Sequence, residues 1–157
     1  MINHFNAKSP IILGMQDAIV SLLGLIAGLY FALIDTNIII ISCIITSITA
    51  AISMSAANYQ ATKAASRKTA LHAGSCTGLS YLVTCAALIL PFFVFSNRTT
   101  ALIFVGCMAI IVIFGFNIVF YRGKSFYRHF FEMLIICAIV SMVAFFIGEI
   151  ANKAFGI

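Results

Sequence analysis

The chain contains five apolar stretches, each long enough to cross a lipid bilayer as a helix. A helix needs about 20 apolar residues to span the hydrocarbon core, and it satisfies its own backbone hydrogen bonds there. Only short connections separate the stretches. We therefore expect an all-α membrane protein in which residues 1–157 form a single transmembrane domain of five helices in one bundle. The predicted helices cover residues 11–34, 37–63, 71–95, 99–121 and 129–151.

The composition excludes a soluble domain. Of the 157 residues, 63% are hydrophobic and only 8% are charged. A folded soluble protein of this size keeps a polar shell that so few polar residues cannot provide. We interpret the first apolar stretch as a spanning helix and not as a cleaved signal peptide, because it is too long and contains Asp17.

The basic residues near the helix ends predict the orientation in the membrane. Cytoplasmic connections carry an excess of Lys and Arg. We therefore expect a cytoplasmic N-terminus and a C-terminus on the opposite side, in the plasma membrane or a vacuole-type endomembrane. The net charge of +5 then reflects this topology and contact with anionic lipid, and no nucleic-acid partner is expected. One side has Lys8, Lys63, Arg67, Lys68, Arg122, Lys124 and Arg128; the other has Arg98 and Lys153.

Asp17 lies inside the first apolar stretch, where a carboxylate costs several kcal/mol and by default marks an ion or substrate path. The alternative is a group near the membrane boundary that reaches water. Small residues at spacings of three and four share its helix face and allow a second helix to approach closely. We predict that this face packs helices and forms the interface of a two-fold homodimer. Its members are Gly14, Ser21, Gly24 and Gly28.

Two residues of the second stretch are expected near Asp17. The turn between the first two helices is centred near Asp35, so in an antiparallel hairpin Met54 lies at the depth of Asp17, with Asn58 one turn closer to the cytoplasm. Carboxylate and amide oxygens suit hard divalent cations, and a thioether adds preference for softer transition ions. The sequence therefore predicts an Fe²⁺ or Mn²⁺ transport site. Met54 as ordinary packing and Asn58 as a helix–helix hydrogen bond remain open.

The other titratable residues are assigned lesser roles. Glu132 is predicted in the first turn of the last helix, with a structural or gating role. The cysteines show no paired spacing and are interpreted as packing residues, and the histidines as interfacial groups and not metal ligands. No catalytic constellation is present in the sequence, so an enzyme is not expected. The histidines are His4, His72 and His129; the cysteines are Cys43, Cys76, Cys85, Cys107 and Cys137.

Four segments together resemble the vacuolar iron transporter family. QDAIVSLLGLIAGLY (16–30) is similar to the first helix of that family, and SMSAANY (53–59) to the end of the second. GLSYLVTCAALILPFF (78–93) and RHFFEMLIICAIVSMVAFFIGEI (128–150) are similar to the third and last helices. The chain departs from the family pattern at Ala18, Ala57 and Asn58, where the family has glycine, glycine and glutamate. It also has no acidic residue between Ala61 and Leu71, where iron-transporting plant members carry a metal-binding segment.

The resemblance implies a dimer of five-helix chains, with an ion path between protomers lined by the first helices. Family members move Fe²⁺, and often Mn²⁺, out of the cytoplasm, commonly in exchange for protons. Matched by motif, Asp17 and Met54 correspond to residues along that path. We therefore expect a protein of metal homeostasis that transports Fe²⁺ or Mn²⁺, with membrane lipid and a second copy as partners and no permanently bound cofactor. Alternatives are a non-transporting relative that serves assembly or regulation, and a proton-coupled carrier of small cations.

Overall fold

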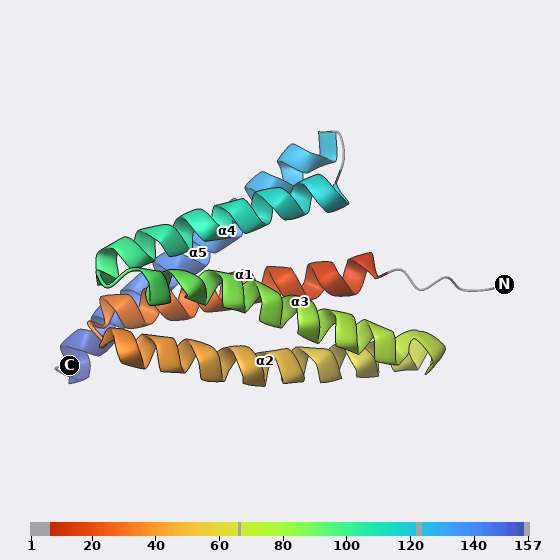
Figure 1. Ribbon diagram of the computed structural model, residues 1–157, viewed down its shortest axis with the longest axis horizontal. Helices are drawn as coiled ribbons and strands as arrows, with labels where there is room; N and C mark the ends of the chain where they lie inside the picture. Colours follow the sequence, from red (N-terminus) through yellow and green to blue (C-terminus); the bar gives the residue numbers. More distant parts are fainter. Residues whose placement is uncertain (1–6, 66, 122–123, 156–157) are drawn as a thin grey trace.

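The computed structural model describes residues 7–65, 67–121 and 124–155, and it consists of five long helices joined by short turns (Figure 1). All five helices are long and apolar enough to cross a membrane. The predicted fold class is confirmed, and the chain is an integral membrane protein; the homodimer stays a prediction. The helices are α1 (Lys8–Phe31), α2 (Thr36–Ala65), α3 (Arg67–Val94), α4 (Arg98–Phe120) and α5 (Lys124–Phe155).

Two helices extend beyond a bilayer's hydrocarbon core. α2 has 30 residues and α5 has 32, which correspond to about 45–48 Å at 1.5 Å per residue, against a hydrocarbon thickness of about 30 Å. The early start of α5 corrects one prediction. Glu132 lies in the third turn of α5 and not in the first, because the helix begins at Lys124. The partial positive charge of a helix N-terminus fades within the first turn, so it does not explain Glu132.

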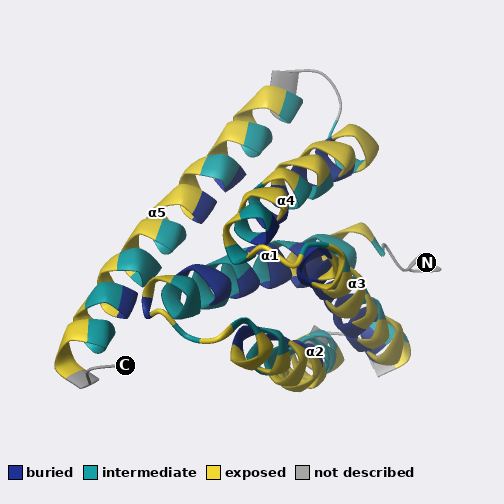
Figure 2. Cartoon of the chain, turned by 60° about the vertical axis from the view of Figure 1, so that its left-hand side comes forward, coloured by how far each residue is buried: buried dark blue, intermediate teal, exposed yellow. Residues whose placement is uncertain are grey.

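α1 occupies the centre of the bundle. It packs mainly against α3 and α5, whereas α2 packs mainly against α3. Three side chains on one side of α1, Ile19, Leu22 and Ile26, have no exposed surface. α5 keeps most of its surface exposed and buries only a narrow stripe (Figure 2). The apolar surface left uncovered on α2 to α5 is the surface that lipid contacts in a spanning protein.

The glycines of α1 pack against helices of the same chain. At Gly14 an added Cβ would collide with the backbone carbonyl of Thr77 in α3. At Gly24 it would lie 2.9 Å from Val140 Cγ1 in α5, and at Gly28 3.7 Å from the carbonyl oxygen of Ala144. The predicted helix-packing role thus operates within one chain. Gly14 is buried, whereas Ser21, Gly24 and Gly28 keep part of their surface accessible, and the dimer interface predicted at this face stays a prediction.

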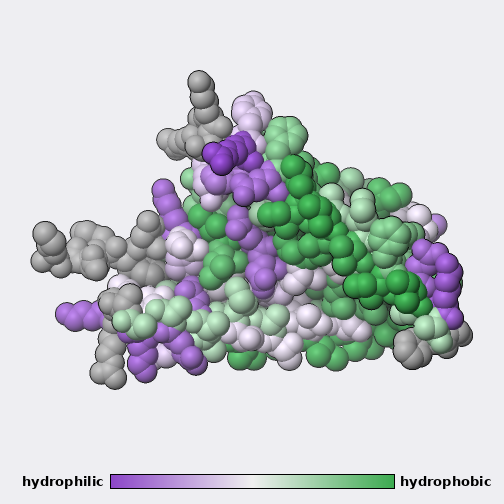
Figure 3. Space-filling model, turned by 180° about the vertical axis from the view of Figure 1, so that it is seen from behind, coloured by the Kyte–Doolittle hydropathy of each residue, from purple (hydrophilic) through white to green (hydrophobic). Residues whose placement is uncertain are grey.

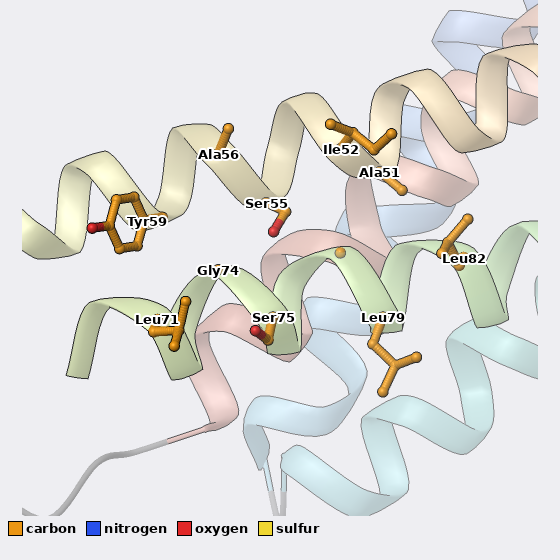
Figure 4. A pocket seen from close by; sticks show the side chains of 11 residues that line it. Ala51, Ile52, Ser55, Ala56, Tyr59, Leu71, Gly74, Ser75, Leu79 and Leu82 are labelled. Atoms are coloured by element: carbon orange, nitrogen blue, oxygen red, sulfur yellow. The ribbon is translucent and has the colours of Figure 1, made fainter. Parts of the chain in front are cut away.

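α2 and α3 approach closely along small residues near the end that carries the N-terminus. A Cβ at Gly74 would lie 2.7 Å from the Ser55 carbonyl oxygen, and one at Gly78 3.2 Å from that of Ala51. A groove of about 520 Å³ lies beside this contact (Figure 4). Its described lining is mostly small and apolar and includes no carboxylate, imidazole or thiol. We therefore assign this groove to lipid and helix packing.

The two ends of the bundle differ in charge. The N-terminus and the α2–α3 and α4–α5 connections lie at one end, and the C-terminus and the other two connections lie at the opposite end (Figure 1). The basic residues separate between these ends as the topology prediction requires; Arg122 lies outside the described residues. Which end faces the cytoplasm stays a prediction.

Arg98 links the start of α4 to the end of α1 at the opposite end of the bundle. Its guanidinium donates hydrogen bonds to the carbonyl oxygens of Tyr30, in the last turn of α1, at 2.9 Å and of Ile34, just beyond that turn, at 3.2 Å. It also lies over the Tyr30 ring, 4.6 Å from the centroid. Carbonyls at a helix C-terminus lack intrahelical partners, and a cation there satisfies them.

We expect Arg98→Gln to lower the free energy of unfolding by roughly 1.5–3 kcal/mol, since a hydrogen bond to a charged group contributes about that much. The measurement is detergent-induced unfolding of the purified protein. Lys153→Gln is the matched control, because Lys153 is an exposed cation at the same end that pairs with Glu149 at 2.7 Å. Equal losses in both variants would show that Arg98 contributes only surface charge.

Candidate functional site

Asp17 is held by α1 within the spanning segment, and its side chain is neither fully buried nor exposed. It lies close enough to Tyr81 and Cys85 of α3 to interact with both electrostatically. One turn further along α1, Ser21 Oγ and the Tyr81 hydroxyl are hydrogen-bonded at 2.8 Å. Among the described residues, no side chain donates a hydrogen bond to the Asp17 carboxylate. Its oxygens are therefore available to a cation.

α3 supplies the polar side chains that face α1. Thr77 and Tyr81 have no exposed surface and Cys85 is 1% exposed. Their spacing of four residues places them on one helix face. Thr77 and Tyr81 were not predicted from the sequence, and Cys85 was predicted only as a packing residue. The four-residue spacing of polar groups within an apolar helix indicates that they share one helix face. It does not indicate which neighbouring helix that face contacts.

Asn58 joins α2 to α3. Its amide Nδ2 donates to Thr77 Oγ1 at 2.5 Å, and that hydroxyl lies 3.1 Å from the Pro10 carbonyl oxygen of α1. Three helices are thus linked at one level, two turns from Asp17 toward the N-terminus of α1. The helix–helix hydrogen bond, one of the two interpretations left open for Asn58, is the contact present in this structure. Its role as a metal ligand stays a prediction.

Met54 is partly buried and packs against the hydrophobic core. α3 supplies most of the packing surface of α2, and α1 contributes much less. The hairpin assumption behind the convergence of Asp17, Met54 and Asn58 therefore overstates how closely α1 and α2 meet. The contacts described for Met54 are those of packing.

The Asn58–Thr77 bond should carry a measurable coupling energy. In a double-mutant cycle of Asn58→Leu and Thr77→Val, we expect the two losses of stability to be less than additive by about 0.6–1.7 kcal/mol, the range for hydrogen bonds between membrane helices. Unfolding free energies in mixed micelles provide the measurement. Strict additivity would indicate that the two side chains do not stabilise the three-helix junction together.

A small polar cavity of about 250 Å³ opens between α1 and the start of α5. Within it, His129 Nδ1 is 3.6 Å from Glu132 Oε2, and the Tyr121 and His129 ring centroids are 4.0 Å apart. The pair lies on exposed α5, and Gln16, the residue before Asp17, lines the same cavity from α1. The described lining residues are Gln16, Tyr121, His129, Glu132, Met133 and Ile136.

Asn117 is a buried polar residue that the sequence analysis missed. It is 1% exposed, and its amide donates to the Ile113 carbonyl oxygen at 2.8 Å. Its Oδ1 has no hydrogen-bond partner among the described residues. A buried acceptor of this kind usually bonds an ordered water. A single asparagine within an apolar stretch indicates a polar contact inside the bundle. The sequence does not reveal that the face of α4 with Asn117 is the buried one.

The fold and this site define a polytopic helical membrane protein with a carboxylate held between helices inside the membrane. The model of the VIT family matches residues 9–70, which include α1, α2 and the start of α3. This match confirms the resemblance over that region and is consistent with membership of the vacuolar iron transporter family. The matched segment contains Asp17, Met54 and Asn58. No curated protein matches the chain.

Proposed function

We propose that the protein moves divalent transition-metal ions, Fe²⁺ or Mn²⁺, out of the cytoplasm along a path that passes Asp17. The family match supports membrane transport of metal ions as the class of activity. The observation that carries the proposal is the Asp17 carboxylate, placed inside a spanning helix with no hydrogen-bond donor among the described residues. Such a charge persists in a membrane helix where an ion or proton uses it.

The surroundings of Asp17 favour a weakly held and releasable ion. The described residues contain no group of three or more His, Cys, Asp or Glu side chains that could hold a metal. One carboxylate supplemented by neutral oxygens binds a divalent cation loosely, and conduction requires that an ion leave as well as enter. A proton taken up by Asp17 on metal release would give the metal–proton exchange that we expect.

The two other candidate functions make different predictions. A non-transporting relative would keep the fold and show no flux of any ion. A carrier of small organic cations would need aromatic faces around its substrate. Tyr81 is the aromatic side chain described beside Asp17, and its hydroxyl is hydrogen-bonded to Ser21. A single ring is a poor cage for an organic cation, which favours the metal.

The test is ion flux into liposomes that contain the purified protein and an internal metal-sensitive dye. We expect saturable entry of Mn²⁺ and Fe²⁺ that exceeds entry of Ca²⁺ and increases with a proton gradient of opposite direction. Protein-free liposomes are the control. Flux of neither metal in correctly folded protein, with or without a gradient, would overturn the proposal and favour the non-transporting relative.

A further inference from the structure

The His129–Glu132 pair on α5 has no role in the path described so far. It lies near the end of the bundle where α4 is followed by α5, which is the predicted cytoplasmic end. Viewed from behind, a hydrophilic band runs down from the α4–α5 end of the molecule between hydrophobic regions (Figure 3). Both side chains are accessible, at 37% and 59% exposure. Neither is required to hold the hydrophobic core together.

We propose that His129 and Glu132 form a loading site for a divalent transition-metal ion, which then passes to Asp17. For His129 this replaces the interpretation from the sequence, which was an interfacial group and not a metal ligand. This inference rests on the proposed transport function. Imidazole and carboxylate are both ligands for Fe²⁺ and Mn²⁺. Residues three apart share a helix face. Helical di-iron proteins bind metal through a Glu and a His at this spacing, with the Glu first, whereas here the His comes first.

The distance between the two groups fits one shared ion. Bonds of about 2.1 Å to each ligand at a right angle place the ligand atoms roughly 3 Å apart. His129 Nδ1 and Glu132 Oε2 are 3.6 Å apart, and small rotations of two accessible side chains close that difference. Tyr121 stacks on the imidazole at 4.0 Å between centroids and limits its rotation. The pair is therefore partly organised before an ion arrives.

The cavity has room for the additional ligands that a metal ion held by two side chains needs. Its volume of about 250 Å³ is room for roughly eight waters at about 30 Å³ each, which would complete the coordination shell. The buried Met133 and the Gln16 amide also line it and offer weaker ligands. Two protein ligands and several waters give a site that captures an ion and releases it. Gln16 precedes Asp17 on α1, so the cavity lies beside the turn of α1 that carries the candidate path residue.

Arg128, the basic residue nearest to His129 and Glu132 along α5, does not enter the cavity where the metal ion would bind. Arg128 lies one turn before Glu132 on α5, and both line a separate shallow hollow on the outside of this helix. Among the described residues, the close side-chain contact of Glu132 is with His129. Arg128 faces that outer hollow and is absent from the described lining of the cavity.

The experiment measures Mn²⁺ binding by electron paramagnetic resonance in the Asp17→Asn background, where the charge of the transport path is removed. We expect binding to persist there and to weaken on the order of tenfold or more when Glu132→Gln or His129→Gln is added, at least the loss that an outer-shell partner causes. Pulsed measurements should detect imidazole nitrogen coupled to the bound Mn²⁺, and His129→Gln should remove that coupling.

Glu149→Gln is the matched control, since Glu149 is also paired on α5 but lies at the opposite end. It should leave binding unchanged, and all variants should elute and melt like their parent. Binding in the Asp17→Asn background that ignores both substitutions, or no binding and no nitrogen coupling, would overturn the loading site. Flux through wild-type liposomes tests the transport function separately, so either proposal can fail while the other stands.

Discussion

Asp17→Asn should reduce Mn²⁺ and Fe²⁺ flux to the level of protein-free liposomes while the protein still folds. Asparagine keeps the shape of aspartate but cannot carry the charge that balances a divalent ion inside the membrane. The described hydrogen bonds of the helix face around Asp17, including the one between Ser21 and Tyr81 at 2.8 Å, do not involve the carboxylate. Expression and thermal stability should therefore survive the change.

The matched control for this substitution is Asp35→Asn. Asp35 is exposed in the turn at the other end of the same helix pair, where its Oδ1 accepts a hydrogen bond from the Thr36 amide at 3.1 Å. An asparagine oxygen can accept that bond equally well, so flux should stay at the wild-type level. Normal flux in Asp17→Asn would exclude Asp17 from the mechanism. Loss of flux in both variants would point to a general defect.

Gly148→Ala should separate α5 from α1. A Cβ at Gly148 would collide with the carbonyl oxygen of Gly28 and lie 3.2 Å from the Ala32 amide nitrogen. Both are backbone atoms that cannot rotate away, so the helices must move apart. Overpacking of this kind costs about 1–3 kcal/mol. We expect that loss in unfolding free energy, together with reduced flux, because α5 carries His129 and Glu132.

Gly115→Ala on α4 is the matched control, and it should not lower the free energy of unfolding. A Cβ there would meet nothing within 4 Å. Alanine is favoured over glycine in a helix by up to about 1 kcal/mol, so this variant should be as stable as the parent or more stable. Similar destabilisation by both substitutions would show that the close contact between Gly148 and Gly28 does not hold the two helices together.

Hydropathy was sufficient to predict the helices but not all of their ends. The predicted 37–63 and the observed Thr36–Ala65 nearly coincide, because Asp35 bounds that apolar stretch on one side and basic residues follow it on the other. α5 starts at Lys124, before the predicted residue 129, because Lys124, Ser125 and Arg128 interrupt the apolar pattern there and hydropathy locates spans and not helix ends. This error misplaced Glu132 and concealed its position beside the polar cavity.

The candidate site was only partly predictable. Asp17 could be identified from the sequence, because a carboxylate in an apolar helix is rare and costly. Its neighbours on α3, Thr77 and Tyr81, could not, since the order of helices in a bundle is decided by packing between surfaces distant in the sequence. Treating α1 and α2 as a closely packed pair directed attention to Met54 and Asn58. In the structure both α1 and α2 pack more extensively against α3 than against each other.

The most direct test of the central claim is infrared difference spectroscopy of the protein with and without Mn²⁺. The chain has only four acidic side chains, so the carboxylate bands can be assigned by substitution. The account predicts a carboxylate band that shifts when Mn²⁺ binds to the wild-type protein and is missing from the spectrum of Asp17→Asn. A metal-induced spectrum that is identical in the two proteins would contradict binding of the ion at Asp17.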